Sequence, residues 1–373
     1  MKKILVYKDK SQYNVLNYFA ESLTRELNLL YPAKCIDLSE NNSEEILINE
    51  ADKGIELTIG FNAISSQYTY IVKDIPHIAI FVDHPLYACD NIDLTSKNIY
   101  ISCIDEERVS FIRNKLNFDN VFVLNHAVDR NIEHNIYGDK TFDIVMLGGL
   151  KNPENLRLEF KDKYHSNKPI LQLIDYVSEL ALNNSIFPLE DLFDSVIQIM
   201  DIDININEIS PLYKELFCDI ELYFRTISRK KAIESFKEFN IDIFGNIEKD
   251  IFPRDSKINI HEAIDNKQAL EVLKNSKISL NNSKFIYNGS HERVLLAAAC
   301  GSINLTNETS YFKSIFKNNA IYYNDLIVKS AEEQIEQILK NDKKRIEMCL
   351  KANEVVMKNH TWKNRAEQII NMI

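Results

Sequence analysis

Short apolar runs alternate with amphipathic stretches along the first third of the chain. Six runs rich in Ile and Val have the length of buried strands, namely 3–7, 34–38, 55–61, 77–85, 98–104 and 120–128. The stretch 12–30 spaces its apolar side chains three and four residues apart, which predicts a helix, and 105–116 predicts another with an acidic first turn. Strands that alternate with helices indicate an open parallel sheet with helices on both faces.

A second pattern of strands and helices begins near residue 142. The run 142–150 ends in two glycines, and further strands are expected at 241–246, 277–282 and 302–306. Between them, about 151–228 shows helical spacing and no strand pattern. The chain therefore predicts an α/β fold of two Rossmann-like halves with parallel sheets, the second of which carries a helical insertion.

The length of 373 residues fits two domains. We expect an N-terminal Rossmann-like domain over 1–140 and a C-terminal one over 141–358. The remaining 359–373 are expected to form a C-terminal helix, capped by Thr361, that packs back towards the first domain.

Composition and charge limit the classes of function. The 44 basic and 55 acidic side chains give a net charge of −11, which argues against non-specific nucleic-acid binding but leaves room for a local basic pocket. The six cysteines are widely spaced and form no Cys-x-x-Cys pair, as expected of free thiols in a reducing compartment. No run approaches 18 apolar residues, so a cytoplasmic protein without a transmembrane segment is predicted.

One predicted helix, over 291–300, combines a polar start with an apolar body. Ser290 is a favourable N-cap, and Gly301 stands where a left-handed residue ends a helix. A helix N-terminus offers free backbone N–H groups to an anion, and Arg293 adds a guanidinium suited to phosphate oxygens. The simpler alternative is a buried helix with an ordinary polar start.

Glycine placement favours the anion site. The chain has only 8 glycines, and five fall at predicted strand ends or around this helix: Gly148, Gly149, Gly245, Gly289 and Gly301. Ligands of open α/β sheets bind at the carboxyl ends of the strands, near the point where the strand order reverses. A phosphorylated ligand is therefore expected there, although no Gly-x-Gly-x-x-Gly loop occurs.

These residues resemble the C-terminal half of group-1-type glycosyltransferases of the GT-B fold, in particular the CgeB-like branch. The similar segments are "SKISLNN" (276–282), "ERVLLAAACGSINLT" (292–306), "NHTWKNRAEQII" (359–370), "RKKAIESFKEFNIDIFGN" (229–246), "FDIVMLGG" (142–149) and "IFVDHP" (80–85). The resemblance is good over roughly the last 145 residues and weak over the first 150. The insertion is not accounted for.

The resemblance implies a hexosyl- or hexosaminyltransferase with a nucleotide-sugar donor, UDP-sugar favoured, in the second domain. The acceptor, a protein, a glycan or a lipid-linked sugar, is implied in the first domain. No cofactor and no essential metal are expected, and catalysis is implied in the cleft between the domains. The implied donor-binding residues are Gly148, Gly149, Gly245, Asn246, Tyr287, Asn288, Gly289, Ser290, His291, Glu292, Arg293, Thr306 and Asn307.

One position departs from the family pattern. Leu296 stands where the family usually has a glutamate that commonly holds the donor ribose. Either Glu292, one turn earlier, takes over contacts to the ribose or sugar, or donor binding is weakened or lost. The departure favours a non-catalytic scaffold as an alternative. A nucleotide-sugar 2-epimerase of similar fold is another, but the several carboxylates that it needs near the sugar are not identifiable.

Asp83 and His84 are the candidate catalytic residues, because both follow a buried strand of the first domain and precede Pro85. Either could serve as the base that deprotonates an acceptor hydroxyl or as an acceptor ligand. Asp83 could instead merely cap the next helix, and His126, at another strand end, is expected to be structural. The Asp-x-Asp pattern at 201–203 is interpreted as a solvated loop.

Overall fold

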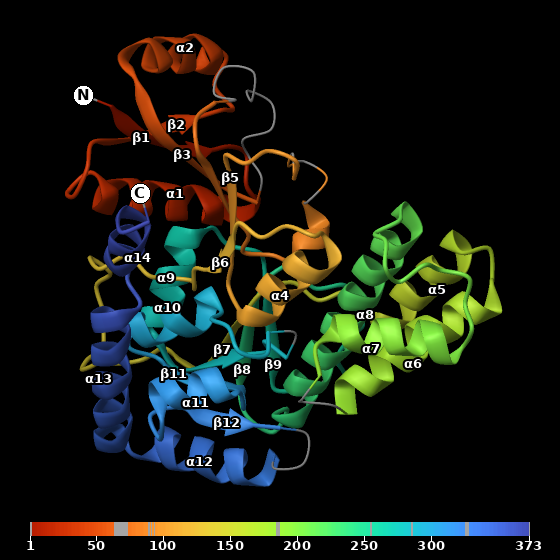
Figure 1. Ribbon diagram of the computed structural model, residues 1–373. Helices are drawn as coiled ribbons and strands as arrows, with labels where there is room; N and C mark the ends of the chain where they lie inside the picture. The colour runs from red at the N-terminus through yellow and green to blue at the C-terminus, as the bar shows by residue number, and fades with distance from the viewer. Residues whose placement is uncertain are drawn as a thin grey trace. The chain divides into compact units, whose positions relative to one another are not determined.

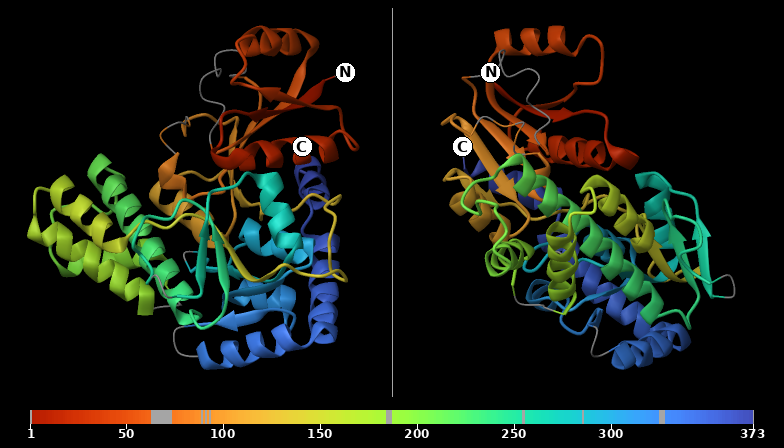
Figure 2. Two further views of the ribbon diagram at one scale, coloured as in Figure 1. Left: turned by 180° about the vertical axis from the view of Figure 1, so that it is seen from behind. Right: turned by 90° about the vertical axis from the view of Figure 1, so that its right-hand side faces the viewer.

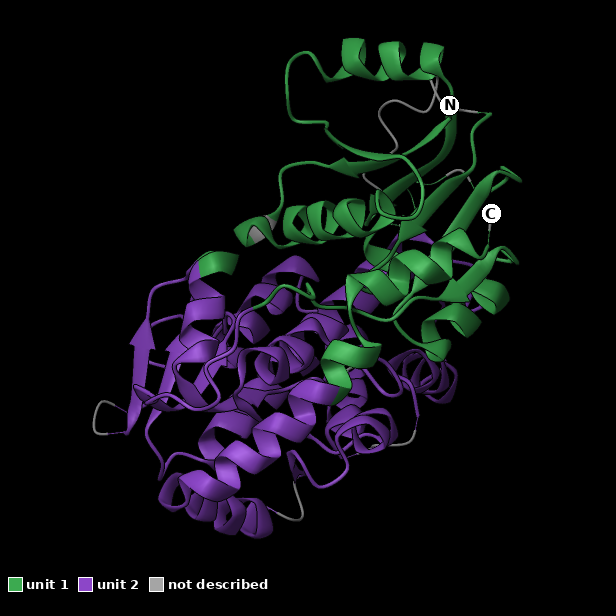
Figure 3. Ribbon diagram, turned by 90° about the vertical axis from the view of Figure 1, so that its left-hand side faces the viewer, with its two compact units in different colours: residues 1–132, 265–267, 355–373 green, residues 133–264, 268–354 purple. Residues whose placement is uncertain are grey.

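The computed structural model describes residues 2–62, 74–88, 90, 92, 94–183, 187–253, 256–284, 286–324 and 328–372 (Figure 1). The chain forms two compact units (Figure 3). Unit 1 consists of residues 1–132, 265–267 and 355–373, and unit 2 of residues 133–264 and 268–354. Cys89 lies outside the described residues, and the described cysteines are free thiols.

Unit 1 is built on a six-stranded parallel sheet in the order β2-β1-β3-β4-β5-β6. Its strands are β1 (Lys3–Lys8), β2 (Ala33–Asp37), β3 (Ile55–Phe61), β4 (His77–Ile80), β5 (Ile99–Cys103) and β6 (Val121–Val123). Its helices are α1 (Val15–Leu27), α2 (Ser43–Lys53), α4 (Glu106–Lys115) and α14 (Trp362–Ile370), with short 3-10 turns η1 (Gln12–Asn14) and η3 (Pro85–Tyr87).

The last helix of the chain belongs to the core of unit 1. Trp362 is buried in α14, with its ring centroid 5.3 Å from that of Phe19 in α1 and 5.8 Å from that of Phe61 in β3. Arg365 fixes the same helix by donating from Nε to the Asn125 carbonyl at 2.8 Å. The apolar side chains on this face therefore hold α1 and α14 on one side of the sheet.

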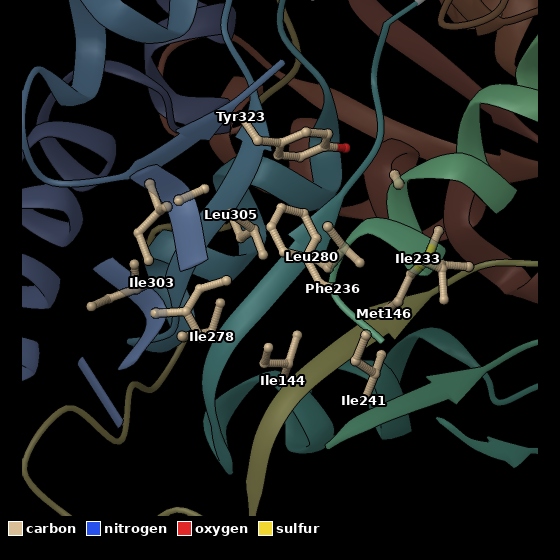
Figure 4. Close-up of a cluster of buried hydrophobic side chains, with 14 of the residues drawn as sticks. Ile144, Met146, Ile233, Phe236, Ile241, Ile278, Leu280, Ile303, Leu305 and Tyr323 are labelled. Atoms are coloured by element: carbon tan, nitrogen blue, oxygen red, sulfur yellow. The ribbon is translucent and has the colours of Figure 1, made fainter. Parts of the chain in front are cut away.

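Unit 2 is built on a second six-stranded parallel sheet, in the order β12-β11-β10-β7-β8-β9. Its strands are β7 (Phe142–Leu147), β8 (Ile241–Phe244), β9 (Ile258–His261), β10 (Ser276–Asn281), β11 (Ile303–Asn307) and β12 (Ile321–Tyr323). Around them lie α9 (Asn266–Lys274), α10 (Glu292–Cys300), α11 (Ser310–Phe316), α12 (Val328–Lys340) and α13 (Asp342–Asn359). Figure 4 shows the core on this sheet, where Phe236 and Tyr323 pack with Ile and Leu side chains of the central strands.

Four helices form the insertion, as its spacing predicted: α5 (Pro153–Lys163), α6 (Lys168–Asn183), α7 (Leu189–Ile199) and α8 (Pro211–Ser235). They lie together beside the sheet of unit 2 (Figure 2). The long helix α8 begins after Ser210, whose hydroxyl accepts a hydrogen bond from the Tyr213 N–H at 3.1 Å. Phe193, Tyr213 and Phe217 fill the space between α7 and α8.

The predicted α/β architecture of two parallel sheets with a helical insertion is confirmed. The sequence reading missed the edge strands β9 and β12 and the helices α9 and α11. β9 has four residues and β12 three, so they are too short to show a period, and the burial of β9 is only partial. None of the described helices is both long and apolar enough to span a bilayer.

Candidate functional site

The strand order of unit 2 reverses between two central strands. From β7 the chain continues outward to β8 and β9, then returns to β10 on the other side of β7 and continues to β11 and β12. The carboxyl ends of β7 and β10 therefore flank the switch point of the sheet, where doubly wound α/β proteins bind their ligands.

Glycines allow the backbones that follow β7 and β8 to lie close together at the carboxyl ends of these strands. The Gly148 N–H donates to the Phe244 carbonyl at 2.9 Å, and the Leu150 N–H donates to the Asn246 carbonyl at 3.0 Å. A Cβ on Gly245 would lie 2.3 Å from the Gly148 carbonyl oxygen, which no side chain tolerates. Gly148 itself has φ 137°, a conformation that favours glycine.

Helix α10 begins one residue later than predicted. His291, not Ser290, is its N-cap, because the His291 side chain accepts from the Arg293 N–H. Gly301 ends the helix with φ 85°, as predicted. The body of α10 is buried, and Leu296 is only 5% exposed, so the position of the usual family glutamate is apolar and largely covered.

Two arginines converge on the place where the backbones of Gly148 and Gly245 approach each other closely. Arg293, in the first turn of α10, donates from Nη1 to the Leu147 carbonyl, and Arg229, in α8, donates from Nη1 to the Gly149 carbonyl. A Cβ on Gly148 would lie 2.7 Å from Nη1 of Arg293 and 3.5 Å from Nη1 of Arg229. Both guanidinium groups therefore lie against Gly148 at the carboxyl end of β7.

The charge of this arginine pair is poorly compensated. Burial, followed by repulsion from Arg293 and Arg225, lowers the pKa of Arg229 well below its usual range. Among the described residues, the buried Nε of Arg229 has no hydrogen-bond partner. Glu292 is the carboxylate that lies beside the pair, 3.4 Å from Nε of Arg293. Buried cationic groups with unused donors are suited to an anionic ligand.

His291 joins this cluster at the start of α10. Its Nε2 lies 3.1 Å from Nη2 of Arg293, and its Nδ1 lies 3.0 Å from Oε2 of Glu292. Burial lowers the pKa of His291, and the Glu292 carboxylate opposes that shift. The His291 ring therefore contacts both the Arg293 and the Glu292 side chains at the start of α10.

Sequence reasoning did not single out Arg229. The segment 229–246 resembles a family helix that contains an arginine. Because α8 has four basic residues close together, the sequence does not indicate which of them binds a ligand: Arg225, Arg229, Lys230 and Lys231. Only tertiary contacts distinguish them. One residue earlier, the Ser228 hydroxyl lies 3.1 Å from Nδ2 of Asn282 after β10, which ties this part of α8 to the sheet.

The other predicted donor residues lie at the end of β11 and in the segment before α10. Thr306 and Asn307 end β11, and Asn307 Oδ1 accepts from the Ser283 N–H at 2.9 Å. Tyr287, Asn288, Gly289 and Ser290 precede α10, and Asn288 Oδ1 accepts from the Ser310 hydroxyl. The structure thus places Gly148, Gly149, Gly245, Asn246 and Arg293 together. Binding roles for all the predicted residues stay predictions.

Asp83 and His84 follow β4 in unit 1 and have different environments. Asp83 is exposed, and its Oδ2 accepts from Nδ2 of Asn62 at 2.8 Å. His84 is buried against Phe111, and its Nδ1 accepts from the Leu86 N–H at 3.3 Å, which caps η3. The cap that follows this strand is therefore His84, not Asp83.

His126 and the Asp-x-Asp segment 201–203 have the environments expected of structural and surface residues. His126 is buried beside Phe19, as expected for a structural histidine. Residues 201–203 lie between α7 and α8, with both Asp side chains exposed, as expected of a solvated loop. In the part of the chain that the structure describes, no group of three or more His, Cys, Asp or Glu residues could hold a metal ion.

The sequence and fold match known proteins over different extents. Residues 225–371, less than half of the chain, match the family model described as "Glycosyl transferase-like". No curated protein matches the sequence. An α-glucosyltransferase solved in complex with UDP and a 13-mer DNA has a similar structure, with a TM-score of 0.62, 9% identity, and coverage of 99% of this chain and 98% of that chain.

Sucrose-phosphate synthase from Thermosynechococcus elongatus is also similar, with a TM-score of 0.54, 7% identity, and coverage of 100% of this chain and 98% of that chain. The fold is GT-B. TarM is matched with a TM-score of 0.46 and 12% identity. The match covers 88% of this chain but only 58% of TarM.

Proposed function

We propose that this protein is a glycosyltransferase that moves a hexosyl or hexosaminyl group from a nucleoside-diphosphate sugar, UDP-sugar favoured, to an acceptor hydroxyl or amide. The observation that carries the proposal is the convergence of Arg229 and Arg293 on Gly148 at the switch point of the unit 2 sheet. The family match over 225–371 includes both arginines and supports the proposal.

The arginine pair has the chemistry that a diphosphate leaving group needs. A guanidinium has five N–H donors, so one that donates to a backbone carbonyl keeps others for phosphate oxygens. The positive end of the α10 helix dipole adds positive potential at the same edge of the sheet. Because negative charge grows on the diphosphate as the bond to the sugar breaks, these groups stabilise the transition state more than the bound donor.

Asp83 is the better candidate base of the two that the sequence indicated. His84 is buried against Phe111, and its Nδ1 already accepts from the Leu86 N–H, so its ring is less accessible to an acceptor than the Asp83 carboxylate. Asp83 has an exposed carboxylate that can take a proton from an acceptor. An Asp83 base fits transfer with inversion at the anomeric carbon, in which the acceptor attacks directly.

The proposed acceptor is a protein, a glycan or a lipid-linked sugar. We propose that it is not a nucleic acid, although three structures of the α-glucosyltransferase neighbour contain DNA and a β-glucosyltransferase neighbour is named as a DNA-modifying enzyme. The reason is electrostatic, because the chain has a net charge of −11 and its insertion contains a long segment without basic residues.

A non-catalytic role is the second candidate, and Leu296 is the observation that favours it. Its side chain is 5% exposed and offers no hydrogen-bonding group to a ribose. A scaffold that had lost donor binding would show no affinity for UDP-, GDP- or dTDP-sugars in titration calorimetry. Measurable affinity together with turnover would exclude that role.

Arg293→Ala tests the placement of the diphosphate. Loss of one charge-assisted contact is worth about 1.5–3 kcal/mol, so we expect the Kd for UDP to rise by roughly tenfold to a hundredfold. Titration calorimetry measures the affinity, and circular dichroism checks the fold. The matched control is Arg157→Ala, which breaks a 2.6 Å contact to Asp175 in the insertion and should leave the Kd unchanged. Equal affinities for the two variants would refute the placement.

A further inference from the structure

We propose that Asn62 is the positioning residue for the Asp83 carboxylate, an inference that rests on the proposed role of Asp83 as base. Asn62 directly follows β3, and Asp83 lies just beyond the neighbouring strand β4. Because carboxyl ends of adjacent parallel strands lie side by side, the two residues meet at the same edge of the unit 1 sheet.

The Asn62 amide makes two kinds of contact at once. Its Oδ1 accepts from the Val82 N–H at 3.0 Å, and its Nδ2 donates to Oδ2 of Asp83 at 2.8 Å. The first contact holds the backbone of the loop after β4, and the second holds the carboxylate that this loop carries. A side chain that carries both an acceptor and a donor is needed to make both contacts.

The backbone conformation of Asn62 indicates that its amide side chain has a specific role. Its φ is 46°, in the left-handed region, where glycine is the least strained residue and asparagine is tolerated. Glycine at this position would relieve the backbone but remove both amide contacts. The position therefore carries an amide where the conformation alone favours glycine.

Holding the carboxylate matters because Asp83 is exposed. An exposed aspartate ordinarily samples several rotamers, and a base must lie within hydrogen-bond reach of the proton that it removes. Fixing one carboxylate oxygen leaves the group in one orientation before the acceptor arrives. A misplacement of about 1 Å can lower a rate by roughly a hundredfold.

Two substitutions separate the contacts. Asn62→Asp keeps an acceptor for the Val82 N–H and tolerates the left-handed backbone, but it loses the donor to Asp83. Asn62→Gly loses both contacts. Asn117→Asp is the matched control, because Asn117 is an exposed asparagine of unit 1 with φ 50°.

Crystal structures of the full-length chain and these variants test the inference without any substrate. We expect the Asp83 carboxylate to leave its present rotamer in Asn62→Asp and Asn62→Gly and to keep it in Asn117→Asp. An unchanged Asp83 rotamer in both Asn62 variants would overturn the inference. That result is independent of whether UDP binds at Arg293, so it is distinguishable from failure of the proposed function.

Rates of UDP release from UDP-glucose and UDP-N-acetylglucosamine, with water as acceptor, give a second readout. Asn62→Asp should lower kcat by roughly tenfold to a hundredfold, towards the rate of Asp83→Asn, and leave KM for the donor unchanged. A wild-type kcat in Asn62→Asp would contradict the inference.

Discussion

Arg229 and Arg293 show which part of a site the sequence can predict. Arg293 lies in the first turn of a helix with a glycine before it and a glycine after it, so its place at a helix start could be predicted from the sequence. Arg229 is one of several basic residues on α8, and only the path of that helix past Gly149 places it at the site. A charge brought in from a distant helix leaves no local sequence signal.

His77 predicts how the stability of the fold depends on pH. Burial lowers its pKa to about 4 from an ordinary value of about 6.5, and its Nδ1 lies 2.9 Å from the Thr58 hydroxyl. The unfolded chain therefore binds a proton at a higher pH than the folded chain. Its contribution to stability is complete above about pH 6.5 and is lost as the pH falls towards 4, by up to about 1.4 kcal/mol per pH unit.

Urea unfolding of wild type and His77→Gln between pH 7 and pH 4 measures that contribution. We expect the free energy of unfolding of the wild type to fall more steeply with acidification than that of the variant. His134→Gln, at an exposed position, is the control and should follow the wild type. Parallel slopes for wild type and His77→Gln would show that His77 does not carry the effect.

At the scale of elements, long periodic segments were predictable and short ones were not. The apolar body of α10 and the strands on either side of it follow from composition. The residues at which strands end were harder to predict. The run 77–85, for example, continues in apolar residues after β4 ends at Ile80. There the chain leaves the sheet to form the Asn62–Asp83 contact, which depends on a residue from the neighbouring strand.

The close approach of the backbones after β7 and β8 gives a prediction for Gly245→Ala. The new Cβ would lie 2.3 Å from the Gly148 carbonyl oxygen, so the two backbones must separate. We expect a loss of about 1–3 kcal/mol in the free energy of unfolding, measured with urea, together with weaker UDP binding.

Gly138→Ala is the matched control, because the atoms nearest to its Cβ belong to the Asn135 side chain, which can move at the cost of its hydrogen bonds to the Gly138 N–H and the Asp139 carbonyl. We expect its unfolding curve to lie close to that of the wild type. If Gly245→Ala were as stable as Gly138→Ala and bound UDP normally, the close approach of these backbones would have no role in the site.

For the whole molecule, alternation of strands and helices was enough to predict two parallel sheets, and the resemblance supplied the GT-B arrangement. The insertion was visible as helical spacing, but its purpose was not. Residues 169–213 within it contain eight acidic side chains and no Lys, Arg or His. A surface of that sign repels phosphate backbones.

This charge predicts that the protein does not bind DNA. Fluorescence anisotropy with a labelled 13-mer duplex at low salt should show no saturable binding up to micromolar protein. If tight and salt-sensitive binding were found, the acceptor class would have to include nucleic acids, as the DNA complex of the α-glucosyltransferase shows for that protein.

A crystal structure of the protein soaked with UDP is the most direct test of the central claim. The account predicts diphosphate density beside Gly148, with oxygens within hydrogen-bond distance of Arg229, Arg293 and the first amides of α10. Diphosphate density elsewhere, or an empty site beside Gly148 at a UDP concentration that saturates binding in solution, would contradict it.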